Sequence, residues 1–130
     1  MFKNLIIASF LGLLAVILGA FGAHSLKEVL TIDGMASFQT AVRYQLFHVL
    51  VILVINGFDF LTEKQKNSIS YLFIAGILFF SGSIYLIQLT SITGKSIWFV
   101  TPLGGLFFVV GWMFLFVIFL KKSRKKDLKL

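Results

Sequence analysis

Four long apolar segments alternate with short polar connectors along the 130-residue sequence. A helix needs about 20 apolar residues to cross the roughly 30 Å hydrocarbon core of a bilayer, and each segment has about this length. We expect the spans at about residues 4–24, 40–59, 69–90 and 98–120. The pattern predicts an all-α membrane protein whose four transmembrane helices form one bundle.

Composition agrees with this class of protein. Hydrophobic residues make up 58% of the chain and charged residues only 13%, whereas a typical soluble domain has about 25% charged residues. The sequence has no cysteine, and its two histidines, His24 and His48, have no intramembrane carboxylate beside them. These residues fall short of a metal site or a hydrolase triad. We therefore expect no catalytic residue and no cofactor.

Basic residues predict the orientation in the membrane. Six of the 12 basic residues lie in segment 121–130, directly after the last apolar segment. If this tail is cytoplasmic, as the positive-inside rule indicates, an even number of spans places the N-terminus in the cytoplasm too. We predict one N-in, C-in domain over residues 1–120, followed by a basic cytoplasmic tail. The tail is expected to contact anionic lipid headgroups rather than nucleic acid.

The first apolar segment has one alternative interpretation. Lys3 precedes it, and Ala20 to Gly22 weakly resemble the small-residue cleavage site of a secretory signal. The apolar stretch is longer than the roughly 7–15 residues of a signal core. We therefore expect the segment to be retained as a span.

Small residues predict close contacts between helices. Ala15, Gly19 and Ala23 recur at intervals of four in the first segment, and Gly104 and Gly105 lie near the start of the fourth. Small side chains at such spacing let the backbones of membrane helices approach each other. We interpret both sets as packing positions.

Polar residues interrupt the apolar segments mainly in the half predicted to face outward. On the second helix, Gln45, His48 and Asn56 share one face. Because unpaired polar groups are costly in hydrocarbon, this face should point into the bundle. Arg43 is expected to reach the membrane interface. The candidate polar layer consists of His24, Arg43, Tyr44, Gln45, His48, Ser81, Ser83, Tyr85, Gln88 and Thr101.

The sequence leaves two interpretations of this layer open. It can be a hydrogen-bond network that fixes helix packing, with gains of about 0.6 kcal/mol per bond. It can also be an outward-open pocket in which His48 responds to protons, because imidazole titrates near neutral pH.

Four motifs carry a family resemblance. They are GAFGAHSLK (residues 19–27), FQTAVRYQLFHVL (38–50), AGILFFSGSIYLI (75–87) and TPLGGLFFVVGW (101–112). Together they resemble the uncharacterised bacterial inner-membrane family typified by YgdD and YwdK. This family is catalogued as domain-of-unknown-function family 423, and it is similar to eukaryotic transmembrane protein 256. The resemblance implies a four-helix protein of the bacterial inner membrane and transfers no catalytic residue.

The expected function is that of a non-catalytic membrane component. It would support envelope integrity or bind a lipid or a partner, either another membrane protein or a second copy of itself. The alternative is a small-solute or proton transporter or channel that uses the polar layer.

Overall fold

The computed structural model describes residues 2–127, with side chains described through Lys125. Its elements are α1 (Phe2–His24), α2 (Ile32–Asn56), α3 (Glu63–Gly76), the π-helix η1 (Ile77–Ser81), α4 (Gly82–Leu89) and α5 (Val100–Asp127). The elements α3, η1 and α4 join into one continuous helix, so the described chain has four helices long and apolar enough to cross a membrane. The predicted fold class is confirmed.

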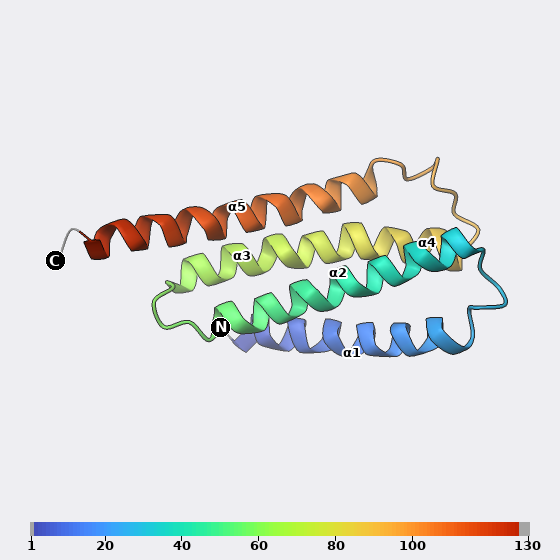
Figure 1. Cartoon of the computed structure of the whole chain (residues 1–130), viewed down its shortest axis with the longest axis horizontal. Coiled ribbons are helices and arrows are strands. Elements are labelled where there is room, and N and C mark those ends of the chain that lie inside the picture. The colour runs from blue at the N-terminus through green and yellow to red at the C-terminus, as the bar shows by residue number, and fades with distance from the viewer. Residues whose placement is uncertain (1, 128–130) are drawn as a thin grey trace.

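The spanning helices run in alternating directions, so the start of α1 and the end of α5 lie toward the same end of the bundle (Figure 1). We call this the terminal end, and it also holds the connector of residues 57–62. The opposite end, called the distal end, holds the connectors of residues 25–31 and 90–99.

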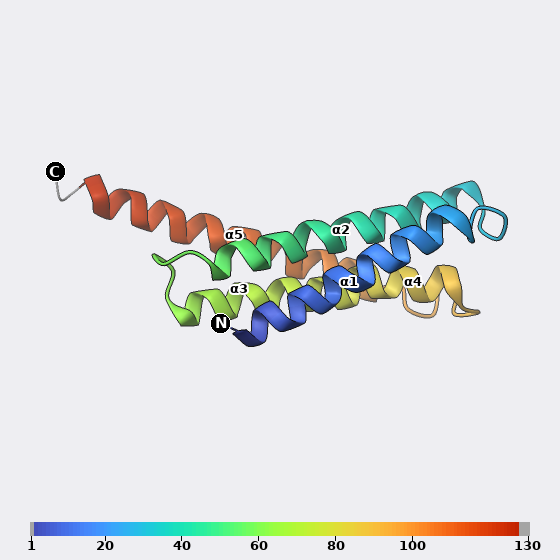
Figure 2. The same cartoon turned by 90° about the horizontal axis from the view of Figure 1, so that it is seen from below.

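The middle of the bundle is formed by α2 and by the helix that contains α3, η1 and α4. α1 packs mainly along α2, and α5 packs along α3 and η1. Figure 1 shows α1 and α5 at opposite edges of the bundle. Figure 2 shows that α1 runs obliquely, beginning near α3 and ending near the distal end of α2. The two central helices therefore hold the bundle together.

Each edge helix buries one narrow stripe. On α5 the stripe has residues spaced alternately by four and three, namely Gly104, Phe108, Gly111, Leu115 and Ile118. This spacing keeps one face of a helix against its neighbours. The other faces carry large apolar side chains, such as Phe116, which is 62% exposed. An apolar exterior of this kind suits lipid rather than water.

Polar caps set where two of the helices begin. The hydroxyl of Thr31 accepts a hydrogen bond of 3.0 Å from the backbone amide of Gly34 at the start of α2. Thr62 and Gln65 form a reciprocal capping box at the start of α3. Both helices therefore begin before the ranges expected for the second and third spans, and α5 continues into the basic tail. Hydropathy marks the part of a helix that suits lipid, so the membrane boundaries stay predictions.

The helix α5 crosses η1 with almost no space between the two backbones. The π-helix is marked by the bond from the amide of Gly82 to the carbonyl of Ile77, five residues back. A Cβ atom on Gly104 would lie 2.7 Å from the carbonyl carbon of Phe79 and would collide with the amide nitrogen of Phe80. Glycine is therefore required at this crossing.

Candidate functional site

Gln45 connects three helices through its side-chain amide. Its Nε2 donates a hydrogen bond of 2.7 Å to the carbonyl oxygen of Leu11 in α1. Its Oε1 accepts a bond of 2.7 Å from the hydroxyl of Tyr85 in α4. Gln45 is only 3% exposed. A buried amide with both ends paired fixes the relative rotation of α1, α2 and α4.

Two serines extend these connections. The hydroxyl of Ser81 donates to the carbonyl of Ala41 in α2 at 2.7 Å. The hydroxyl oxygens of Ser83 and Thr101 lie 2.5 Å apart, and this contact joins α4 to α5. Side-chain hydrogen bonds thus link all four spanning helices. We call this set the distal polar layer, made of Gln45, Ser81, Ser83, Tyr85 and Thr101.

His48 uses both ring nitrogens in hydrogen bonds. Its Nδ1 lies 2.7 Å from the carbonyl oxygen of Tyr44. The indole Nε1 of Trp112 donates to its Nε2 over 3.1 Å. A carbonyl can only accept and an indole N–H can only donate, so this geometry requires the neutral tautomer with its proton on Nδ1.

The surroundings of His48 are aromatic. Its ring stacks on Phe108, with centroids 3.7 Å apart and planes 9° from parallel. Phe73 contacts another part of the ring at 5.1 Å between centroids. These side chains fill the space between α2 and α5 and leave His48 only 5% exposed. We call this set the central aromatic cluster, made of Tyr44, His48, Phe73, Phe80, Phe108 and Trp112.

A second polar layer lies nearer the terminal end. Asn4 donates to the side-chain oxygens of Asn56, at 3.2 Å, and of Asn67, at 2.7 Å. Asn56 donates in turn to the hydroxyl of Ser70 at 2.9 Å. We call this set, Asn4, Asn56, Asn67 and Ser70, the terminal polar layer. It joins α1, α2 and α3, and every buried side-chain nitrogen or oxygen in the described part of the chain has a partner.

Sequence reasoning missed most of the terminal polar layer. It placed Asn56 on the inward face of the second helix but assigned it no partner. Asn4 interrupts an apolar run close to the N-terminus, and Asn67 and Ser70 are three residues apart on one helical face. That spacing was a usable signal, although Asn67 lies before the range expected for the third span.

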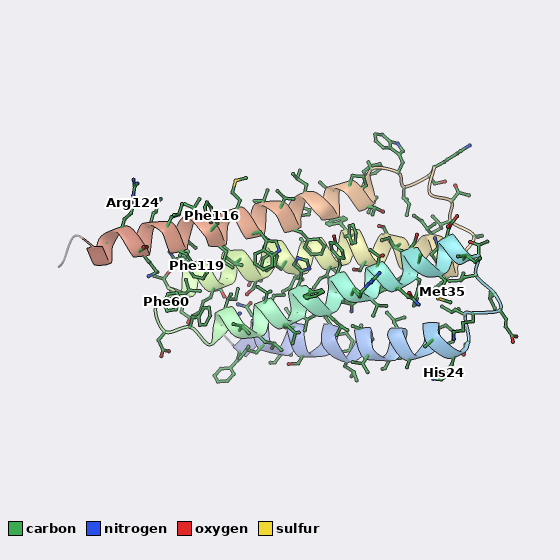
Figure 3. All side chains as sticks on the ribbon, viewed as in Figure 1. His24, Met35, Phe60, Phe116, Phe119 and Arg124 are labelled. Atoms are coloured by element: carbon green, nitrogen blue, oxygen red, sulfur yellow. The ribbon has the colours of Figure 1, made fainter. Side chains whose placement is uncertain are left out.

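Five expected members of the candidate layer lie outside the two polar layers, and one of them, His48, belongs to the central aromatic cluster. His24 is the last residue of α1 and is exposed at the distal end, where the chain leaves the bundle (Figure 3). Arg43 is exposed, and its guanidinium lies 3.4 Å from the hydroxyl of Thr40 on the same helix. The amide oxygen of Gln88 lies beside Gly34 at the start of α2. Tyr44 belongs to the central aromatic cluster together with His48.

Only some of the residues predicted to pack between helices do so in the structure. Ala15 is fully buried and Gly19 faces Val42, but Ala23 is exposed and Gly22 lies against the ring of Phe38. Residues four apart on a helix differ by about 40° in direction, so a stripe with intervals of four gradually turns away from its neighbour. An interval of three, from Gly19 to Gly22, turns the stripe of α1 back toward α2. In α5, Gly104 meets backbone, whereas a Cβ atom on Gly105 would have an ordinary contact at 4.0 Å with Phe80.

A hollow of about 410 Å³ opens beside the distal polar layer, between α2, α4 and the start of α5. Polar side chains on its walls include Ser37, Thr40, Gln88 and Thr101. Among the described residues, no group of three or more His, Asp or Glu side chains could hold a metal ion. The hollow is therefore a depression whose walls mix these polar side chains with apolar ones, such as Ile84 and Ile87.

Four apolar spanning helices joined by internal hydrogen bonds define a small multi-pass membrane protein. The sequence model of the family described as "Protein of unknown function (DUF423)" matches residues 18–105. The chain belongs to this family.

Curated relatives agree with this assignment. A UPF0382 membrane protein of Staphylococcus aureus is 36% identical to this chain over 87% of the chain and 91% of the relative. The UPF0382 membrane protein YwdK of Bacillus subtilis is 34% identical over 90% of the chain and 95% of the relative. The UPF0382 inner membrane protein YgdD of Escherichia coli is 38% identical over 93% and 92%. No solved structure matches the chain. The protein is thus a multi-pass protein of the bacterial cell membrane.

Proposed function

We propose that the protein is a non-catalytic component of the inner membrane that supports envelope integrity by presenting a rigid four-helix surface to lipid or to a partner. The observation that carries this proposal is the pairing of Gln45 with Leu11 and Tyr85. A polar side chain at this position could face a solute pathway, but here both ends of its amide are bonded to neighbouring helices.

The central aromatic cluster supports the same function. Phe108 of α5 stacks on the ring of His48. The neutral ring also has both a donor and an acceptor partner. Protonating Nε2 would remove the acceptor that the Trp112 indole needs. The arrangement therefore favours a packing role for His48 over a proton-transfer role.

The proposed orientation places the terminal end in the cytoplasm. The basic residues at the end of α5 would then face the anionic lipids of the inner leaflet. The partner could be lipid, another membrane protein or a second copy of this chain, and the apolar faces of α1 and α5 are available to each.

Deleting the gene and restoring it in variant forms tests the role. We expect lower survival of the deletion strain under detergent or osmotic stress, and recovery with the wild-type gene. A Gln45→Leu variant that loosens the bundle should recover survival only in part. Normal stress survival of the deletion strain would contradict the proposal.

A second candidate function is transport of a small solute or a proton, favoured by the distal hollow and the polar side chains on its walls. Purified protein in liposomes distinguishes the two functions, with a pH-sensitive dye inside for protons and swelling in isosmotic solutes for uptake. Under the structural proposal the flux equals that of empty liposomes. A protein-dependent flux that Thr101→Val abolishes would establish the transport function instead.

A further inference from the structure

A groove of about 430 Å³ lies at the terminal end between α5 and the first turn of α3. Its walls combine an apolar and a basic part along α5. Phe114, Val117 and Ile118 form the apolar part. The basic part includes Lys121 and Lys125, and Gln65 of α3 lines the opposite side. The groove is therefore amphipathic along the helix axis.

Helical spacing accounts for this division. The positions of Phe114, Val117, Ile118, Lys121 and Lys125 follow an i, i+3, i+4, i+7, i+11 pattern, which places them on one face of a helix. From Phe114 to Lys121 the axis rises about 10 Å. The groove thus passes from the apolar part of α5 to its basic end within two helical turns.

The basic part is concentrated and held in place. Lys122 and Arg124 also line the groove, and no carboxylate does so among the described residues. The ammonium of Lys122 lies 5.6 Å from the ring centroid of Phe60, a cation–π distance. Figure 3 shows Phe60 and Phe119 turned toward each other between α5 and the connector. Phe60 therefore holds the side chain of Lys122 at one edge of the groove.

We propose that this groove is a discrete binding site for one anionic phospholipid of the inner leaflet. An acyl chain lies along Phe114 and Val117, and the phosphate is bound by Lys121 and Lys125. Basic pockets beside membrane helices on the cytoplasmic side suit such headgroups. The site rests on the proposed orientation, because only the terminal end in the cytoplasm exposes the groove to the inner leaflet.

Charge and shape together select this occupant. A nucleic acid would contact the cations but would leave the apolar wall uncovered. A second copy of the chain would bring another cationic α5 end against this one. An anionic phospholipid matches both parts of the groove at the depth where each part lies.

Native mass spectrometry of the detergent-solubilised protein with dioleoyl phosphatidylglycerol tests the site. We expect one tightly retained lipid on the wild type, and weaker retention of dioleoyl phosphatidylcholine. Lys121→Gln/Lys125→Gln should reduce the apparent affinity for phosphatidylglycerol by about tenfold or more, given the usual contribution of a basic side chain near anionic lipid. Val117→Trp should do the same by filling the apolar part while all charges remain.

Two matched variants serve as controls. Lys3→Gln/Lys64→Gln removes the same charge from exposed positions at the same end, and Val109→Trp adds the same bulk to a lipid-facing position of α5. Both should retain wild-type affinity. Circular dichroism checks folding, and Lys121→Met/Lys125→Met, which keeps the aliphatic stems, replaces the glutamine pair if that pair loses helix.

Specific results would overturn the site. Equal loss in the Lys3/Lys64 control would show attraction by net charge alone, and full affinity in Val117→Trp would show that no acyl chain occupies the groove. Competition by glycerol phosphate as strong as by the lipid would show a headgroup-only site. The assay needs no bilayer and no orientation, so these failures would leave the proposed envelope role and topology standing, to be judged by their own tests.

Discussion

Trp112 of α5 donates a hydrogen bond of 3.1 Å to Nε2 of His48 in α2, over a separation of 64 residues in sequence. The bond closes a chain that begins at the carbonyl of Tyr44 and passes through the imidazole ring. A polar connection is thereby placed among aromatic rings between α2 and α5. Its energetic contribution can be measured at both residues.

Trp112→Phe should lower the free energy of unfolding by about 1 kcal/mol or somewhat more, because it leaves the buried Nε2 of His48 without its donor and removes aromatic contact area. Chemical unfolding in mild detergent measures the change. Trp98→Phe, at a position that is 73% exposed, is the matched control and should be neutral. Equal effects at the two tryptophans would contradict the role of the bond.

His48→Gln tests whether the site is structural or responds to protons. A glutamine amide can donate to the carbonyl of Tyr44 and accept from Trp112, so the fold and the stress phenotype should persist. His48→Leu should destabilise the bundle because it leaves both partners unpaired. A His48→Gln protein that folds normally but loses a pH-dependent phenotype would favour the proton-responsive interpretation.

Gln45→Leu and Tyr85→Phe should show coupled effects on unfolding. Each variant breaks the bond between the two side chains, so the double variant should lose less stability than the sum, with a coupling energy of roughly 0.6–1.7 kcal/mol. The control is the pair Gln39→Leu and Tyr85→Phe, because Gln39 is exposed. The stability losses of these two variants should be additive. If the losses of Gln45→Leu and Tyr85→Phe were also additive, the bond between these side chains would not contribute to the stability of the bundle.

Gly104→Ala should destabilise the protein far more than Gly105→Ala. A methyl group at Gly104 would collide with the backbone of η1, whereas at Gly105 it would make only an ordinary contact. Because backbone cannot rotate away as a side chain can, we expect a loss of about 1–3 kcal/mol at Gly104. Thermal unfolding of the two variants side by side decides the matter, and tolerance of alanine at both positions would refute the close crossing.

Single cysteines test the orientation, since the sequence has no cysteine of its own. Glu28 in the distal connector and Lys64 at the terminal end are both exposed and suitable for substitution. An impermeant thiol reagent applied to intact cells should label Glu28→Cys and miss Lys64→Cys until the cells are permeabilised. The reverse pattern would place the terminal end outside the cytoplasm.

Hydropathy and periodicity could predict a large part of this fold. Four apolar runs gave the four spans, and the shared helical face of Gln45 and His48 correctly indicated burial. Partners were harder to predict, because they depend on how each helix is rotated about its own axis. Nothing local in the sequence indicates that Gln45 meets Leu11 or that His48 meets Trp112.

Two differences have local physical causes. The exposed Ala23 was taken for a packing residue because an interval of four was continued, whereas the buried stripe of α1 also uses an interval of three and reaches Gly22. Asn67 lies before the expected third span, because the polar turn that follows the Thr62 cap lowers the local hydropathy. The capping signal was present in the sequence, but it marks the start of a helix rather than a contact.

The π-helix η1 gives its span two different faces. Continued as a regular α-helix, the buried stripe that includes Ile69, Phe73 and Ile77 would next reach residue 80, but the fully buried position is Ser81. One wide turn thus shifts the phase of every residue that follows it. The first half of the span presents apolar and aromatic groups to α5, while the second half turns hydroxyl groups toward α2 and α5. The two halves of this one continuous helix therefore present differently oriented faces, and each face matches the helices beside it.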